Sequence, residues 1–103
     1  MSWWLYVIEC RNGVLYTGIT KDVEARFAAH CNGKGAKFTR ANPAVAIVGK
    51  ARLMTKGKAL RAEYAFKQLP RLDKLRWCTV GLAAFVRRVR PAPAPTPSFR
   101  EPQ

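Results

Sequence analysis

The sequence predicts an α+β domain built on a small, largely antiparallel three-stranded sheet that is flanked by helices. Two stretches rich in aromatic and β-branched residues, Trp3–Cys10 and residues 14–19, are separated by an Asn-Gly pair of the kind that turns a β-hairpin. A third such stretch, Ala44–Leu53, lies between two segments with a helical spacing of apolar residues. The chain has 103 residues, enough for one modest core, so we expect one domain.

The first helix is predicted over residues 21–31, with Thr20 as its N-terminal cap. Val23, Phe27 and Cys31 recur at every fourth position, which places them on one face of this helix as a buried stripe. An Asn-Gly pair directly after the stripe is expected to end the helix.

Residues 32–43 contain glycine and basic side chains without a helical or strand period, and they are predicted to form a basic, mobile loop. After the third strand, a second helix is expected over residues 55–68, opened by a threonine and ended by a proline. Leu60, Tyr64 and Phe66 are expected to face the core from this helix.

The C-terminal part of the chain divides into an apolar segment and a Pro-rich segment. Residues 72–89 are predicted to be helical, with a strand as the alternative because Gly81 interrupts the pattern. Residues 91–103 cannot bury apolar surface and are predicted to be a disordered tail. The folded domain is therefore expected to span residues 1–90.

The charge of the chain indicates its class of partner. Nineteen Lys and Arg stand against six Asp and Glu, which gives a formal net charge of +13. In so short a chain this excess points to a polyanion, and first of all to nucleic acid. A solvated basic surface, an anionic membrane face and association with ribosomes are the alternatives that charge alone leaves open.

Two further patterns bear on location. No apolar run approaches the ~20 residues of a spanning helix, and the first run meets Glu9 before it could form a signal-peptide core, so we expect no membrane partner. The three cysteines are odd in number, widely spaced and without a C-x-x-C pair. They are expected to be reduced thiols in a cytoplasmic protein.

Five side chains form a set that suits phosphodiester hydrolysis. Tyr6 and Tyr16 lie on the two strands of the expected hairpin, where antiparallel pairing brings their phenols to neighbouring positions. Arg26 and His30 are four residues apart on the first helix and share a face. Glu63 is an isolated acid on the second helix.

The order and spacing of these residues resemble the GIY-YIG nuclease superfamily, in particular its small stand-alone bacterial members. The resemblance covers roughly residues 3–77 and rests on Trp4-Leu5-Tyr6, Tyr16-Thr17-Gly18-Ile19-Thr20, Arg26, His30, Gly35-Ala36-Lys37-Phe38-Thr39-Arg40 and Glu63. Trp4 stands where the first triplet of the family has glycine, and Thr17 stands where the second has isoleucine. Gly18 is kept as a structural residue of the motif.

The resemblance implies a metal-dependent endonuclease. Tyr6, Tyr16, Arg26, His30 and Glu63 match its catalytic positions, and Glu63 is the residue expected to bind Mg²⁺ or Mn²⁺. Arg26 is expected to clamp the scissile phosphate. Tyr16 is favoured as the activator of the attacking water with His30 as its proton relay, and the reverse assignment stays open. A purely structural alternative for Glu63 is an ion pair with Lys67, its neighbour one helical turn away.

The expected substrate is nucleic acid, with DNA favoured and RNA left open, at a branched, damaged or single-stranded structure such as repair enzymes cut. The residues expected to contact it, through phosphates rather than base edges, are Lys34, Lys37, Thr39 and Arg40. A protein partner that supplies specificity and the oligomeric state are both left open. The alternative function is a non-catalytic basic nucleic-acid-binding module on the same fold, which would have no need of Glu63.

Overall fold

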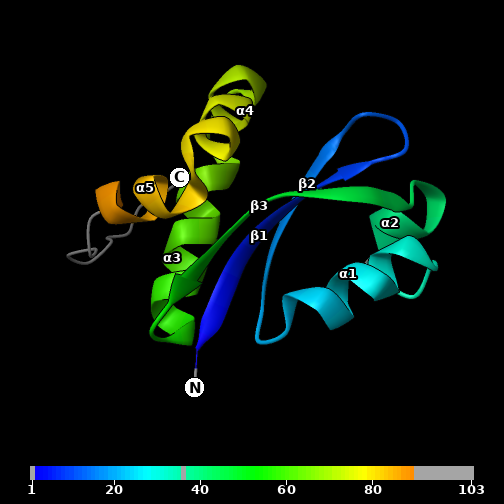
Figure 1. The fold of residues 1–103 in the computed structure, drawn as a ribbon, viewed down its shortest axis with the longest axis horizontal. Coiled ribbons are helices and arrows are strands. Elements are labelled where there is room, and N and C mark those ends of the chain that lie inside the picture. Colours follow the sequence, from blue (N-terminus) through cyan, green and yellow to red (C-terminus); the bar gives the residue numbers. More distant parts are fainter. Residues whose placement is uncertain (1, 36, 90–103) are drawn as a thin grey trace, which may run out of the picture.

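The computed structural model describes residues 2–35 and 37–89. Within them the strands and helices follow in the order β1, β2, α1, α2, β3, α3, α4 and α5 (Figure 1). Their bounds are β1 Trp3–Cys10, β2 Leu15–Thr20, α1 Val23–Cys31, α2 Lys37–Ala41, β3 Ala44–Leu53, α3 Lys56–Lys67, α4 Arg71–Val80 and α5 Leu82–Arg88. The predicted α+β class is confirmed.

The three strands form one antiparallel sheet in the order β2-β1-β3, so β1 is central. The predicted hairpin joins β1 to β2, and Gly13 supplies the positive φ of +83° at its turn. The backbone N–H of Cys10 donates to the carbonyl of Val14 at 2.9 Å and closes the turn. The third strand was predicted within the same bounds as the structure gives.

Helices cover both faces of this sheet, with α1 and α2 on one side and α3, α4 and α5 on the other (Figure 1). Side chains alternate along β1, so Leu5 and Val7 pack against α3 and α5, whereas Tyr6 and Ile8 face α1. Burial on both faces explains why β1 is almost continuously apolar. Tyr6 is the polar exception in this strand's core.

The cap of α1 differs from the prediction. Thr20 is still paired with Trp4 in the sheet, and its hydroxyl accepts from the backbone N–H of Asp22 at 3.1 Å. The carboxylate of Asp22 then caps the helix by accepting from the N–H of Ala25 at 3.1 Å. The helix therefore begins two residues later than predicted. Cys31, expected in the buried stripe, is exposed.

The core face of α3 was also predicted wrongly in part. Leu60 is 46% exposed and Tyr64 is 71% exposed, whereas Ala59, Ala62 and Phe66 are buried. Small alanine side chains let the helix lie close to the sheet, and Phe66 fills the remaining space edge-on to another aromatic ring. The prediction favoured the larger apolar residues and missed the alanines.

Helices also form in the predicted loop and in the C-terminal apolar segment. The predicted mobile loop contains α2, a helix of 5 residues that is too short to show a helical repeat. The C-terminal apolar segment is helical, as favoured over a strand, but Gly81 at φ +128° divides it into α4 and α5. The predicted tail at residues 91–103 lies outside the described residues, and the proposed domain end at residue 90 stays a prediction.

Candidate active site

The site begins with the close contact between Tyr6 on β1 and Gly18 on β2. These residues are register partners, so a side chain at either position would point to the same face of the sheet. A Cβ atom built on Gly18 would lie 2.6 Å from the Tyr6 hydroxyl oxygen and 2.9 Å from Cζ. Only glycine leaves the phenol room to lie across β2, which gives the motif glycine a physical reason.

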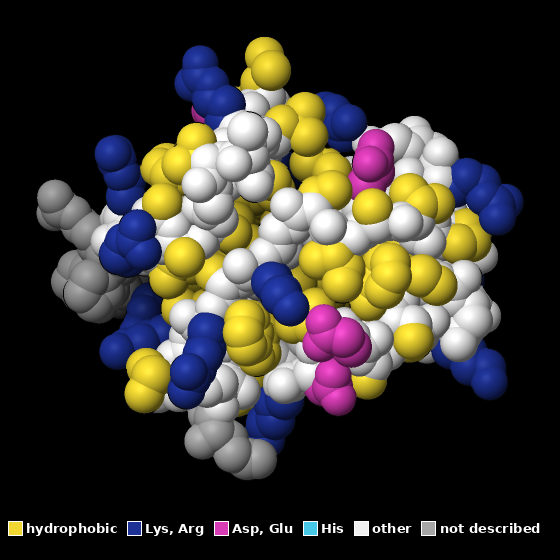
Figure 2. Space-filling view, viewed as in Figure 1, with side chains coloured by type: hydrophobic (Ala, Val, Ile, Leu, Met, Phe, Trp, Pro, Cys, Tyr) yellow, Lys and Arg dark blue, Asp and Glu magenta, His cyan; other side chains and the backbone are white. Residues whose placement is uncertain are grey.

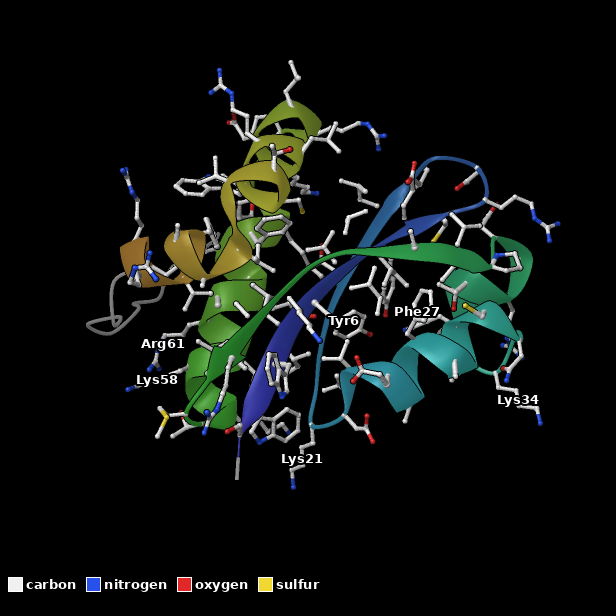
Figure 3. The ribbon with its side chains drawn as sticks, viewed as in Figure 1. Tyr6, Lys21, Phe27, Lys34, Lys58 and Arg61 are labelled. Carbon is white, nitrogen blue, oxygen red and sulfur yellow. The ribbon has the colours of Figure 1, made fainter. Side chains whose placement is uncertain are left out.

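Three rings gather where the hairpin faces α1. Tyr16 is the register partner of Ile8, two pairs along from the Tyr6–Gly18 pair and therefore on the same face of the sheet. The two phenol rings have centroids 6.5 Å apart. The imidazole of His30 lies 5.9 Å from the Tyr6 ring and 5.0 Å from the Tyr16 ring, centroid to centroid. Figure 3 shows Tyr6 together with Phe27 between the sheet and α1. The structure therefore brings the two predicted tyrosines and the predicted histidine together.

The His30 ring is held by hydroxyl groups at both nitrogens. Its Nε2 lies 2.9 Å from the Tyr6 hydroxyl oxygen, and its Nδ1 lies 2.7 Å from Oγ1 of Thr39. His30 and Thr39 are fully buried and Tyr6 is 2% exposed. Each ring nitrogen of His30 therefore has one hydroxyl partner.

Arg26 and burial set the protonation states of this cluster. Burial raises the pKa of the Tyr6 phenol, and a hydrogen bond from Arg26 partly offsets that rise. Burial and then the Arg26 charge lower the pKa of His30. Near neutral pH the site thus holds a protonated phenol, a neutral imidazole and a guanidinium.

Glu63 approaches the cluster from α3. The negative charge of its carboxylate is one of the smaller causes that raise the Tyr6 pKa, which puts it within electrostatic reach of the phenol. Its Oε2 also lies 3.0 Å from Nζ of Lys67. The ion pair weighed as the structural alternative is therefore present. The Glu63 side chain is 19% exposed, and the Lys67 side chain is 50% exposed.

The residues predicted to contact nucleic acid differ in their exposure to solvent. Lys34 and Arg40 are exposed, and Figure 3 shows Lys34 directed outward at the end of α1. The side chain of Lys37 lies outside the described atoms. Thr39 is fully buried against His30, so its place in the nucleic-acid-binding set is wrong. Burial of a small polar residue beside a histidine from another element leaves no signal in sequence spacing.

Gly35 is a second residue whose contact the sequence did not reveal. A Cβ atom built on it would lie 2.4 Å from Nδ1 of His30. The backbone at Gly35 therefore lies against the imidazole, and glycine is the residue type that permits this approach.

Basic side chains also gather at the other end of the sheet. Nζ of Lys21 lies 5.4 Å and Nζ of Lys56 lies 5.3 Å from the centre of the Trp3 ring. Lys50 lies similarly over Trp4, at 5.5 Å. Figure 2 shows lysine and arginine distributed around the visible face, with few acidic side chains between them.

A buried tyrosine–histidine pair, a guanidinium that interacts with the phenol and a carboxylate whose charge acts on the same phenol thus lie together on a small α+β domain. The family model for the GIY-YIG catalytic domain matches residues 2–76. The chain therefore belongs to the GIY-YIG family, whose domains are endonucleases.

Relatives of the chain carry the name UPF0213 protein. One from Xanthomonas axonopodis pv. citri is 51% identical over 75 residues, which cover 73% of this chain and 74% of that protein. Another from Cupriavidus necator is 46% identical over 77 residues, covering 75% and 84% of the two chains. The match reaches most of each relative.

Solved structures agree with the fold. The solution structure of a UPF0213 protein from Bacillus halodurans is 35% identical and has a TM-score of 0.51, covering 85% of this chain and 95% of that one. A protein from E. faecalis is 34% identical with a TM-score of 0.54, covering 78% and 85%. Among the described residues no helix is long and apolar enough to cross a membrane.

Proposed function

We propose that this protein is a metal-dependent endonuclease that hydrolyses phosphodiester bonds in DNA. The observation that carries the proposal is the convergence of Tyr6, Tyr16, Arg26 and His30 on one cluster, with the charge of Glu63 acting on the same phenol. Membership of the GIY-YIG family supports the same activity.

Hydrolysis requires an activated water and stabilisation of the charge that develops on the phosphoryl group. Both ring nitrogens of His30 are engaged by Tyr6 and Thr39, which leaves no lone pair on the imidazole for water. We therefore assign water activation to Tyr16 and give His30 the task of holding Tyr6 in place. This replaces the expected relay from Tyr16 to His30 with a bond from Tyr6 to His30.

Arg26 supplies the positive charge of the site. A guanidinium carries five N–H donors, so its bond to the Tyr6 oxygen leaves others to clamp the scissile phosphate in a charge-assisted fork. Its position one helical turn before His30 keeps the clamp beside the tyrosines.

The donor set suits Mg²⁺ or Mn²⁺ at Glu63. Mg²⁺ commonly takes only one or two protein carboxylates and fills its remaining positions with water and substrate phosphate. Glu63 can offer one such carboxylate, and the described residues contain no group of three or more His, Cys, Asp or Glu of the kind that encloses a metal fully. When bound, the ion would neutralise charge on the phosphate and on the departing oxygen.

The decisive variant is Glu63→Gln, which keeps the shape and helix propensity of the side chain but removes its charge. We expect folding and DNA retardation to survive while cleavage in Mg²⁺ or Mn²⁺ is lost. Loss of the ion pair with Lys67 should lower the free energy of unfolding by only about 0.3–0.5 kcal/mol, because that pair is partly exposed. Melting temperature, gel retardation and cleavage are measured on one preparation.

Lys67→Gln is the matched control, because it breaks the same ion pair and leaves the carboxylate in place. It should lose the same small stability and keep cleavage. If both variants cut as fast as the parent across a range of metal concentrations, Glu63 is structural and the metal assignment is wrong.

The finer assignments are tested by the choice of substrate. We propose a structure-selective role in cytoplasmic DNA repair or processing, because exposed phosphate-binding residues such as Lys34 and Arg40 recognise backbone rather than sequence. Labelled duplex, single-stranded and branched DNA, with RNA in parallel, are incubated with Mg²⁺, Mn²⁺ or EDTA. Retarded but intact nucleic acid under every condition would select the non-catalytic binding module instead.

A further inference from the structure

The buried hydroxyl of Thr39 reaches the tyrosine–histidine cluster from α2. Thr39 lies in α2, is fully buried and places Oγ1 2.7 Å from Nδ1 of His30. A neutral imidazole has one donor nitrogen and one acceptor nitrogen. A buried hydroxyl partner at this distance therefore affects which nitrogen carries the proton, in addition to filling space.

The Tyr6 hydroxyl indicates which nitrogen carries the proton when both hydroxyl partners of His30 are in place. At 2% exposure this O–H needs a hydrogen-bond acceptor, and Arg26 can only donate. Among the hydrogen bonds of the described residues, the acceptor that faces it is Nε2 of His30, at 2.9 Å. The imidazole proton therefore lies on Nδ1, where it is donated to Oγ1 of Thr39.

We infer that Thr39 is a positioning residue that locks His30 in the Nδ1–H tautomer and so keeps Nε2 as the acceptor for the Tyr6 hydroxyl. Gly35 supports the lock, since a Cβ atom there would lie 2.4 Å from Nδ1 and its absence lets the backbone lie against the ring. The tautomer follows from the geometry alone. Its effect on cleavage rests on the proposed nuclease function.

Nitrogen-15 NMR of the histidine ring tests the lock directly, because the chain has one histidine and gives one imidazole to observe. The parent protein is expected to show a protonated Nδ1 and an unprotonated Nε2. Thr39→Val keeps the shape of the side chain but would leave a buried Nδ1–H without its acceptor, at a cost that moving the proton to Nε2 avoids, so the single Nδ1–H tautomer should be lost. Thr39→Ser restores the hydroxyl and should restore the tautomer.

Cleavage kinetics supply the functional readout. Thr39→Val should lower kcat by ~10- to 100-fold with little change in KM, the range seen when partners that orient metal-bound histidines are removed. Thr39→Ser should recover most of the rate. A residue that only filled the core would respond to volume, so Val would then be tolerated at least as well as Ser.

Three results would overturn the inference. These are an Nε2–H tautomer in the parent, an unchanged Nδ1–H tautomer in Thr39→Val, and full kcat in that variant. The first needs no variant, so it decides the matter even if Thr39→Val fails to fold. A different outcome is that the parent shows the Nδ1–H tautomer and Thr39→Val loses it, while the parent cuts no substrate. In that case the role of Thr39 stands and the nuclease proposal fails instead.

Discussion

At the scale of single residues, the site depends on a glycine as much as on its polar side chains. A Cβ atom at Gly18 would overlap the Tyr6 hydroxyl at 2.6 Å, so Gly18→Ala is expected to push the phenol out of its bond with His30. Single-turnover cleavage should fall by ~100-fold, the cost of misplacing a catalytic group by about 1 Å. The fold should survive, since the change adds one methyl group.

Gly49→Ala provides the control on the other side of β1. Gly49 lies in β3 opposite Val7, and a Cβ atom there would first meet the Sγ atom of Cys78 at 3.3 Å, away from the tyrosines. Its cleavage rate should stay near that of the parent. Equal rates in both variants would mean that the position of the Tyr6 phenol does not limit the reaction.

At the scale of elements, Gly81 is the point where α4 ends and α5 begins. Its φ of +128° is open to glycine and strained for other residues, and a Cβ atom there meets nothing within 4 Å. Gly81→Ala therefore tests backbone strain without a steric clash, and it should lower the free energy of unfolding by ~1–3 kcal/mol. Because α5 carries the core residues Leu82 and Phe85, the loss should appear in urea denaturation of the whole domain.

Gly57→Ala makes the same chemical change where the backbone is helical. Gly57 is exposed in α3 and has no positive φ, so alanine should leave stability unchanged or raise it by up to ~1 kcal/mol. Matching losses in the two variants would show that the junction at Gly81 is not strained.

At the scale of the whole molecule, the net charge of +13 is expected to dominate the binding of nucleic acid. Lysine and arginine side chains spread around the face in Figure 2 rather than forming one compact patch, so DNA affinity should be mainly electrostatic. Each neutralised phosphate contributes ~0.9 to the slope of log affinity against log salt, so even about two contacts predict a ~10-fold loss between about 50 and 200 mM salt. Fluorescence anisotropy measures this slope, and a salt-independent affinity would contradict it.

The sequence by itself determined the sheet, the order of its strands along the chain and the residues of the tyrosine cluster. Hairpins and strands such as Ala44–Leu53 can be predicted from local patterns of apolar residues and turn residues. Strand pairing likewise predicts that Tyr6 and Tyr16 lie near each other, and helix periodicity puts Arg26 and His30 on one face, whereas the joining of the two pairs into one site was implied by the resemblance to the GIY-YIG family.

Only the tertiary structure decided how those residues are held. Thr39 was expected at the nucleic-acid surface, and Leu60 was expected in the core, yet Thr39 is buried and Leu60 is 46% exposed. Both outcomes depend on how closely one element approaches another, of α2 to His30 and of the alanine face of α3 to the sheet. Such distances are set by side chains far apart in the chain, and periodicity within one element carries no information about them.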